Sequence, residues 1–308
     1  MTGRISGLFP ALATPVTSTG SVDGAMLDRL CDFLLERGAS GMCLGGATSE
    51  YPRFETGERL EILRRVARRV PRGTTLLAAI GASSVERTLD LGRAAFDAGC
   101  RAVLLPMPWF FPYQQVDLAA YVAHVAETLG GPCLLYDLPD FTTGLDADTS
   151  IALMQSQRNV IGIKDSSGRV EHLLRFVEAR GNRDWTLLVG DDRNGLASAE
   201  AGWDGGISGL AAFCPELLIA LHGAARANDM ELARACQGLV DELITHLAPL
   251  PTPWGVRVGL RLRGLDVGPM PLPISPERAA QIARIEAWFP AWLASVEIPN
   301  LLPARRMS

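Results

Sequence analysis

The sequence predicts a closed (β/α)8 barrel of parallel strands with a helical extension at its C-terminus. Eight short apolar runs alternate with longer amphipathic segments, and this alternation ends near residue 213 of the 308. Such an alternation favours parallel strands, because each helix carries the chain back over the sheet before the next strand begins. We therefore expect one domain over residues 1–308, with a barrel core at 1–213 and barrel-closing and C-terminal helices at 214–308.

Each apolar run is expected to form one buried strand. The runs lie at 7–16, 41–45, 75–80, 102–105, 133–136, 160–164, 187–189 and 205–208. Apolar residues at helical spacing occupy the segments between them, at about 27–35, 57–70, 89–96, 118–129, 150–157, 170–179 and 196–201. Gly38, Pro71 and Gly99 stand where three of these helices should end. Proline- and glycine-containing breaks at 249–253 and 268–276 divide the C-terminal segment into several helices.

An open, nucleotide-binding α/β sheet is the competing fold. It requires a glycine-rich phosphate loop after the first strand, and residues 11–15 contain no glycine. The glycine-containing segment 45–50 after the second strand lacks both the spacing and the lysine of a P-loop. The barrel is therefore the better interpretation.

Composition argues against several classes of partner. The net charge is −5, and the densest basic cluster, at 64–69, has the spacing of a solvated helix face rather than of a nucleic-acid-binding stripe. No run of eighteen apolar residues occurs, so we expect no membrane span. The first residues lack the apolar core of a signal peptide, and the dispersed cysteines suggest the reduced thiols of a cytoplasmic protein.

The cysteines and histidines show no metal-ligand pattern. Six Cys are dispersed without a C-x-x-C pair, and several lie in apolar runs, as reduced buried thiols do. Four His lack a spacing such as H-x-x-x-H, so we interpret them as structural or surface residues and expect no metal.

One residue type is nearly absent from the chain: Lys164 is the single lysine among 29 Lys and Arg residues. It follows the apolar run 160–163, which places an amine at the end of a buried strand. An arginine carries charge but does not deprotonate in proteins, whereas a lysine amine can lose its proton and attack a carbonyl carbon. The sequence therefore predicts that Lys164 is a nucleophile.

The carboxyl ends of all eight strands share one mouth in such a barrel. Tyr136 ends the fifth strand and Lys164 the sixth, so the two should be neighbours about 4.8 Å apart. A phenol beside an amine suits carbonyl chemistry, because the phenol can move protons to and from the oxygens involved while the amine attacks the carbon.

Three other strand ends carry candidate residues. The small-residue turn at Gly46, Ala47 and Thr48 offers free N–H groups and a hydroxyl for a carboxylate, although a tight turn with a capping Thr explains it nearly as well. The pair at 191–192 is better explained by N-capping of the next helix than by acid–base or metal chemistry. The glycines at 205–209 would let the backbone approach a ligand.

The chain resembles the pyruvate-dependent class I aldolase superfamily that includes dihydrodipicolinate synthase and N-acetylneuraminate lyase. The similarity runs from residue 7 to about 276, and its most specific motifs are Tyr-Asp-Leu-Pro at 136–139, Gly-Ile-Lys-Asp-Ser-Ser-Gly at 162–168 and Gly-Asp-Asp at 190–192. The resemblance implies a homotetramer or homodimer without metal or organic cofactor, in which Lys164 forms an imine with pyruvate or a related 2-keto acid. It also implies that Tyr136 transfers protons.

The same resemblance implies the remaining site residues. Thr48 and the nearby backbone of Gly46 and Ala47 would hold the carboxylate of the keto acid. Gly206 and Ile207 would line the pocket, and Phe110 would occupy the place of a family tyrosine.

Three departures argue against dihydrodipicolinate synthesis. Ala47 replaces the first hydroxyl residue of the family's Gly-Thr-Thr-Gly-Glu, and Phe110 replaces the tyrosine that shares a proton relay with it, unless a shifted alignment brings Tyr113 to that place. The arginine that binds the second carboxylate in the synthases is absent from 140–142. Synthase activity therefore stays only as an alternative.

Two hypotheses of different classes remain. The first is a lyase that cleaves, condenses or dehydrates a 2-keto(-3-deoxy) acid, with pyruvate as the keto-acid half and an aldehyde as the other. The second is a non-catalytic protein that binds a keto acid. The aromatic cluster at 109–111 fits either a pocket for a less polar aldehyde or, preferably, packing between subunits.

Overall fold

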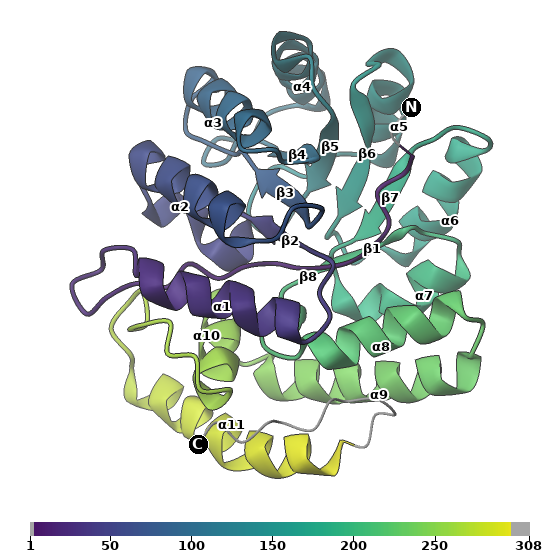
Figure 1. Cartoon of the computed structure of the whole chain (residues 1–308). Coiled ribbons are helices and arrows are strands. Elements are labelled where there is room, and N and C mark those ends of the chain that lie inside the picture. The colour runs from purple at the N-terminus through teal and green to yellow at the C-terminus, as the bar shows by residue number, and fades with distance from the viewer. Residues whose placement is uncertain (1–2, 297–308) are drawn as a thin grey trace.

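Eight parallel strands form a barrel at the centre of the molecule, as the sequence predicts (Figure 1). The computed structural model describes residues 3–296. The strands run in the order β1-β8-β7-β6-β5-β4-β3-β2. Their bounds are β1 Gly7–Pro10, β2 Gly41–Leu44, β3 Thr75–Ala79, β4 Ala102–Pro106, β5 Cys133–Asp137, β6 Val160–Asp165, β7 Thr186–Val189 and β8 Gly205–Ser208.

The barrel closes between β1 and β2 through a single bridge. Ala11, one residue beyond β1, pairs with Cys43 in parallel, and Leu12 N donates to Cys43 O at 2.9 Å. The first strand is shorter than its apolar run 7–16 predicts, because the chain turns away after this bridge.

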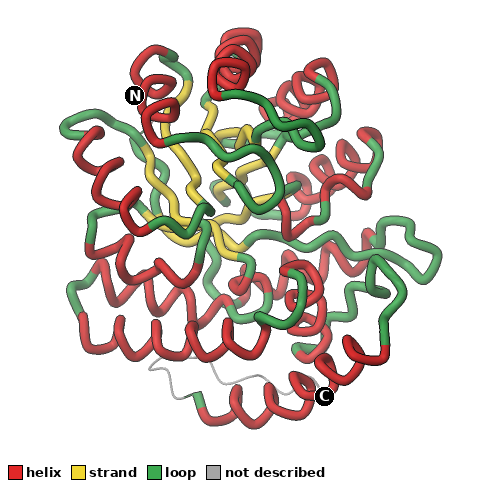
Figure 2. The backbone as a smooth tube through the Cα atoms, turned by 180° about the vertical axis from the view of Figure 1, so that it is seen from behind, coloured by secondary structure: helices red, strands yellow, loops and turns green. Residues whose placement is uncertain are grey.

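Each strand is followed by a helix, and these helices surround the barrel (Figure 2). Their bounds are α1 Gly24–Glu36, α2 Thr56–Arg69, α3 Val85–Asp97, α4 Gln115–Leu129, α5 Ala147–Ser156, α6 Val170–Arg180, α7 Gly195–Glu200 and α8 Pro215–Arg226. Local signals begin several of them. Asp23 accepts a hydrogen bond from Met26 N at the start of α1, and Ser84 accepts one from Arg87 N at the start of α3.

The helical extension consists of α9 Met230–Leu247, α10 Thr252–Leu262 and α11 Pro276–Ser295. These three helices gather at one side of the barrel, beside α1 and α8 (Figure 1). Pro276 stands in the first turn of α11, where a missing N–H costs nothing, and Ser275 caps it. Residues 297–308 of the expected C-terminal segment lie outside the described residues.

Two apolar layers result from the period-two alternation along the strands. Leu77, Leu104 and Leu134 point into the barrel and pack there with Tyr136. Their neighbours along the strands, such as Val103 and Leu135, face outward and pack against the surrounding helices. Lys164 and Tyr136 are therefore polar groups at one end of an otherwise apolar barrel interior.

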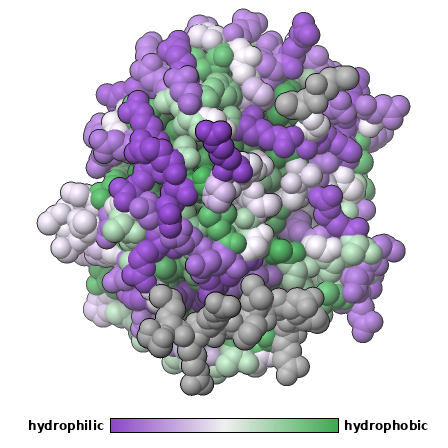
Figure 3. Space-filling model, in the orientation of Figure 1, coloured by the Kyte–Doolittle hydropathy of each residue, from purple (hydrophilic) through white to green (hydrophobic). Residues whose placement is uncertain are grey.

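Hydrophilic side chains cover much of the face seen in Figure 3, with apolar atoms between them. Across residues 3–296, no helix is both long and apolar enough to cross a bilayer. All six cysteines are free and buried, as predicted.

Candidate active site

Lys164 and Tyr136 meet inside the barrel. They are partners in the register of β5 and β6, and Lys164 Nζ lies 2.9 Å from the Tyr136 hydroxyl and 4.1 Å from the centre of its ring. Both side chains are buried, with 6% and 2% of their surfaces exposed. The predicted neighbourhood of amine and phenol is confirmed.

The amine has space because of the residue at the end of the next strand. A Cβ at Gly190, just after β7, would lie 2.7 Å from Lys164 Cε and 2.0 Å from Ser166 Oγ. Any side chain at this position would therefore displace the lysine or the serine. The glycine of the Gly-Asp-Asp motif thus makes room for Lys164.

The rim of β2 lies opposite this pair across the mouth. Ala47, Thr48 and Ser49 form a single 3-10 turn after β2, and Thr48 is buried. No hydrogen-bond partner for Thr48 Oγ1 exists within residues 3–296, and the atom is not sealed from solvent. A Cβ on Gly46 would lie 4.0 Å from the Tyr136 hydroxyl, which places this turn at the same mouth as the amine.

A buried ion pair holds this turn in place. Glu50 adopts a left-handed conformation at φ 54°, and its carboxylate accepts from Arg257 Nε at 2.5 Å and from Arg53 at 2.7 Å. Arg257, on α10, is 2% exposed and also donates to the carbonyl of Val267. The helical extension therefore contributes directly to the shape of the Thr48 turn. Sequence reasoning missed this pair, because 207 residues separate its members.

The aspartates after β7 have different roles. Asp191 caps the following 3-10 turn by accepting from Arg193 N and forms an ion pair with the Arg193 side chain, as N-capping predicts. The carboxylate of Asp192 accepts from the hydroxyl of Ser208, the last residue of β8, at 2.9 Å. Burial raises the pKa of Asp192 to about 6, and hydrogen bonds from Ser208 and the backbone of Leu210, together with the nearby Lys164 side chain, oppose this rise. The sequence interpretation favoured a structural role for this pair, and the hydrogen bond from Ser208 is compatible with such a role for Asp192.

The remaining predicted residues divide into two groups. Ile207 packs with Tyr136 in the barrel interior, and Gly206 lies beside it on β8, close to Val189 and His222. Phe110 does not join this group. Its ring is 86% exposed and contacts Phe111, so its predicted role in substrate binding has no support within this chain.

A second polar cluster lies behind Lys164 and Tyr136, on the outer side of the same strands. Asp137 and Asp165 are register partners, and His172 Nδ1 lies 2.9 Å from Asp165 Oδ2. All three are buried, and their ligand-type atoms lie within 4.8 Å of one another. Sequence spacing did not reveal this arrangement, because the residues come together only through the register of β5 and β6.

This cluster has the donor types of a metal site, but hydrogen bonds already occupy it. Asp137 Oδ1 accepts from Leu145 N and Asp165 Oδ1 accepts from Ser167 N, which ties down the loops that follow β5 and β6. Burial raises the pKa of Asp137 to about 6, and neighbouring Asp165 adds to the effect. We interpret the cluster as a hydrogen-bonded support for the two strand ends.

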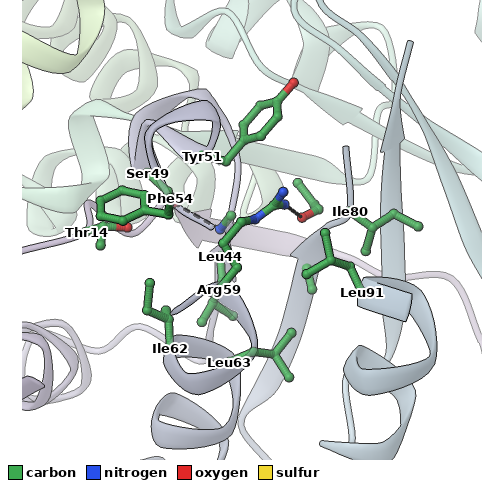
Figure 4. Close-up of a pocket in the computed structure, with 13 residues that line it drawn as sticks. Thr14, Leu44, Ser49, Tyr51, Phe54, Arg59, Ile62, Leu63, Ile80 and Leu91 are labelled. Atoms are coloured by element: carbon green, nitrogen blue, oxygen red, sulfur yellow. Dashed lines mark hydrogen bonds between the residues drawn. The ribbon is translucent and has the colours of Figure 1, made fainter. Parts of the chain in front are cut away.

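A separate pocket lies between the β2–β3 rim and helices α2 and α3 (Figure 4). Arg59 crosses it and donates to the carbonyls of Ala79 and Gly81. Burial lowers the pKa of Arg59 to about 10. Neither Lys164 nor Tyr136 lines this pocket, but Tyr51 does, and Figure 4 shows its hydroxyl directed away from the other lining residues.

Comparisons with known proteins agree with this architecture. The family model described as "Dihydrodipicolinate synthetase family" matches residues 4–288. The 4-hydroxy-tetrahydrodipicolinate synthase of Sorangium cellulosum is 32% identical over 274 residues, covering 88% of this chain and 91% of that one. The corresponding protein of Laribacter hongkongensis is 29% identical over 287 residues, covering 92% and 97%.

Solved structures show the same fold. YagE, an Escherichia coli K12 prophage protein of the dihydrodipicolinic acid synthase family solved in complex with pyruvate, superposes with a TM-score of 0.87 at 25% identity, covering 94% of this chain and 99% of that one. A sialic acid aldolase from Ruminococcus gnavus gives a TM-score of 0.85 at 21% identity, covering 94% and 98%. Taken with the near-complete match of the family model, these findings mean that the chain belongs to the dihydrodipicolinate synthetase family.

Proposed function

We propose that the protein is a lyase that acts on a 2-keto acid through an imine at Lys164. The observation that carries this proposal is the buried contact of 2.9 Å between the only lysine amine of the chain and the Tyr136 hydroxyl. An amine that only served structure would need an acidic partner or a solvated position. Among the residues described, Lys164 forms no ion pair, and its one hydrogen-bond partner is a phenol.

The first chemical stage is imine formation. Lys164 Nζ attacks the keto carbon, the carbonyl oxygen takes up a proton, and the nitrogen loses one to give a carbinolamine. Protonation of the hydroxyl then allows water to leave, which forms the C=N bond. Tyr136 is within hydrogen-bond distance of the nitrogen and is placed to deliver and remove these protons.

The second stage uses the imine as an electron sink. Loss of a proton from C3 of the imine gives an enamine, which adds to an aldehyde in the condensation direction. In the reverse direction the C3–C4 bond breaks and the aldehyde leaves. For a 2-keto-3-deoxy acid, the enamine formed by loss of the C3 proton can instead expel the C4 hydroxyl, which takes up a proton and leaves as water. This step gives the dehydrated imine. Asp192, which has a raised pKa and lies near enough to Lys164 for the two side chains to influence each other electrostatically, is a candidate for contacting the aldehyde half.

The β2 rim supports binding of a carboxylate. Thr48 Oγ1 is free of protein partners in the described chain, and the 3-10 turn around it leaves backbone N–H groups near the mouth. We propose that Thr48 and the backbone of Gly46 and Ala47 hold the keto-acid carboxylate, with pyruvate as the keto-acid half. The YagE structure contains pyruvate in a protein of the same family.

Two alternatives stay open. Synthesis of a dihydrodipicolinate-type product is favoured by the names of the relatives, and the methyl group of Ala47 and the exposure of Phe110 argue against it. A non-catalytic keto-acid-binding protein is the other alternative. The retention of the buried amine beside Tyr136 argues against that one.

We also propose a homotetramer or homodimer in the cytoplasm, without a cofactor or metal. Exposed aromatic side chains lie on the neighbouring loops after β4 and β5, and a contact from Tyr113 N to Thr143 Oγ1 joins these loops. Phe110, Phe111 and Phe141 are the most exposed of them. Such a patch suits contact between subunits, and six buried reduced thiols suit a reducing compartment.

Borohydride trapping tests the proposed function. The protein is incubated with pyruvate and borohydride, and intact mass and peptide mapping locate any adduct. We expect one adduct per chain on the peptide that contains Lys164, and none in Lys164→Arg. Absence of an adduct with pyruvate and with a panel of longer 2-keto acids would reject the imine mechanism. An adduct without turnover of any 2-keto-3-deoxy acid would favour the binding protein.

A further inference from the structure

The Tyr51 side chain lies at the mouth of the barrel and has no role in the chemistry described above. It belongs to a short 3-10 turn after the Thr48 turn and is only 5% exposed. The chain has three tyrosines besides Tyr136, namely Tyr51, Tyr113 and Tyr121, and the Tyr51 hydroxyl lies beside Gly81 and Pro106 at the strand ends. A buried phenol in this position requires an explanation.

The location of its hydroxyl follows from two neighbours. A Cβ on Gly81 would lie 3.2 Å from the Tyr51 oxygen and 2.5 Å from Pro106 Cγ, so the oxygen lies beside both residues. Pro106 ends β4 and is the register partner of Tyr136 on β5. It shares the inward-facing parity of Leu104, so the Tyr51 hydroxyl approaches the interior next to Tyr136.

The ring of Tyr51 is held from two sides. Trp109 packs edge-on against it, with the ring centres 5.4 Å apart, and the Arg59 guanidinium lies 5.0 Å from the ring centre. These contacts fix the ring without using its hydroxyl. Figure 4 shows the result, because the hydroxyl extends away from Arg59 and from the pocket that the ring lines.

The hydroxyl itself is unsatisfied by protein. No residue in the described part of the chain provides it with a hydrogen-bond partner, and the only unpartnered side-chain oxygen sealed from solvent there is Ser150 Oγ. The Tyr51 oxygen therefore reaches accessible space. Burial raises the pKa of Tyr51 above its usual range, with a further contribution from Tyr136, so the hydroxyl stays protonated and acts as a donor.

Tyr136 lacks a donor on this side. Its hydroxyl contacts Lys164 Nζ on one side, and toward the β2 rim Gly46 lies close to it and Ala47 packs against the same interior cluster, neither of which carries a hydroxyl. When Tyr136 gives its proton to the substrate, the oxygen left behind is a phenolate. A phenolate inside an apolar barrel requires a hydrogen-bond donor.

We propose that Tyr51 is a positioning residue that donates a hydrogen bond to the Tyr136 oxygen, directly or through one water molecule, and so supports proton transfer at the imine. This inference rests on the proposed function. The proton that Tyr136 delivers returns to it in the reverse step, so the Tyr51 proton is not consumed and no further reactant is required.

Pyruvate alone serves as the probe, because the aldehyde half is unidentified. In D2O the imine loses a C3 proton and the enamine takes up a deuteron, so NMR of the methyl group measures proton transfer without an aldehyde. Borohydride trapping measures imine formation separately. The variants are Tyr51→Phe, which keeps the ring between Trp109 and Arg59, and Tyr121→Phe as a matched control on a partly buried tyrosine of α4 that packs in the outer apolar layer.

We expect Tyr51→Phe to slow deuterium exchange about 10- to 100-fold at saturating pyruvate, as loss of a hydrogen bond to a charged oxygen predicts. The yield of trapped imine at saturation, the pyruvate concentration for half-maximal exchange and the melting temperature should stay near those of the wild type. Tyr121→Phe should exchange at the wild-type rate.

An unchanged exchange rate in Tyr51→Phe would overturn the inference. So would a slower rate accompanied by a lower melting temperature and weaker pyruvate binding, because a purely structural role gives that pattern. Failure of the proposed function is distinguishable, since the wild type would then form no adduct. A wild-type adduct combined with normal exchange in Tyr51→Phe would reject only the role of Tyr51.

Discussion

The rim formed by β5 and β6 and the rim formed by β2 and β4 contribute to one mouth in different ways. At β5–β6, Tyr136 and Lys164 are inside regular strands and are register partners. Behind them, Asp137, Asp165 and His172 fix the strand ends and the loops that follow. The distance between amine and phenol is therefore determined by the β-sheet itself.

At β2–β4 the functional groups lie on loops and 3-10 turns. Thr48 and Tyr51 belong to two consecutive short turns, and the left-handed residue Glu50 joins them. The loop after β4 carries Trp109, which packs on Tyr51, and Phe110, which is exposed. The comparison teaches that the two groups needing one fixed distance are on strands, whereas the groups proposed to bind the keto-acid carboxylate and to assist Tyr136 are on turns, whose shape depends on contacts from elsewhere in the chain.

The largest expected effect comes from a change at the β5–β6 rim, where the amine and the phenol lie on strands. Tyr136→Phe keeps the ring beneath the amine, 4.1 Å from Nζ in the wild type, and removes only the hydroxyl. We expect deuterium exchange into pyruvate to fall about 10²- to 10⁴-fold, the range for loss of a general acid–base group. The measurement is the NMR exchange assay, with trapping by borohydride to show that the imine still forms on longer incubation.

Thr48→Val provides the matched change on the opposite rim. It replaces the hydroxyl of the buried Thr48 side chain with a methyl group and keeps the shape of the side chain. We expect the pyruvate concentration for half-maximal exchange to rise about tenfold, with a smaller loss in the maximal rate. If Tyr136→Phe affected only pyruvate binding while Thr48→Val lowered only the rate, the assignment of proton transfer to one rim and carboxylate binding to the other would be wrong.

The next prediction concerns the buried Glu50–Arg257 ion pair, which holds the turn that carries Thr48. Arg257→Met keeps the length of the side chain and leaves Glu50 buried without its closest cation. Removing one partner of a buried ion pair lowers the free energy of unfolding by about 3–5 kcal/mol. The loss should be smaller here, because Arg53 still pairs with Glu50. Urea unfolding monitored by circular dichroism should show this loss, together with weaker pyruvate binding.

Arg93→Met is the control for that experiment. Arg93 pairs with Asp90, and these side chains are 56% and 60% exposed, so the expected change is within about 1 kcal/mol. Equal losses of unfolding free energy in Arg257→Met and Arg93→Met would mean that burial does not make the Glu50–Arg257 pair more stabilising than an exposed ion pair.

The same contrast explains what sequence could and could not predict. Strand–helix alternation predicts the barrel, and barrel geometry brings Tyr136 and Lys164 together, because register neighbours are a local consequence of parallel strands. No pattern in the sequence brings Glu50 to Arg257, since a contact across 207 residues depends on how α10 packs. Tyr51 was equally hidden, because its role depends on the direction of a side chain on an irregular turn.

The sequence also did not predict whether the side chains of Phe110 and His172 are buried or exposed. Phe110 looks like a pocket residue by alignment, but its left-handed conformation at φ 82° turns its ring outward to 86% exposure. His172 looks like an ordinary histidine by spacing, yet the register of β5 and β6 buries it with two carboxylates. Periodicity identifies faces of regular elements and does not describe loops or coupled polar clusters.

The smallest expected effect tests whether the negative charge of Asp137, in the cluster with Asp165 and His172, lowers the folding stability. The pKa of Asp137 rises from an ordinary 3.8 to about 6, mainly through burial, while Asp165 raises it further and His172 and Arg169 lower it. Below about pH 3.8 the carboxyl is protonated in folded and unfolded chains alike. Between there and about pH 6 the unfolded chain ionises first, so folding stability falls as pH rises and stays reduced above pH 6.

Asp137→Asn removes this ionisation and keeps the oxygen that accepts from Leu145 N. We expect the variant to be more stable than the wild type by about 1–3 kcal/mol at pH 8, with no difference near pH 4, in thermal unfolding across that range. Asp184→Asn, at an exposed loop position, should show no such pH dependence. A variant less stable at pH 8 would mean that the charge of Asp137 holds the cluster together. The β5–β6 rim would then depend on an ionic network rather than on its strand register alone.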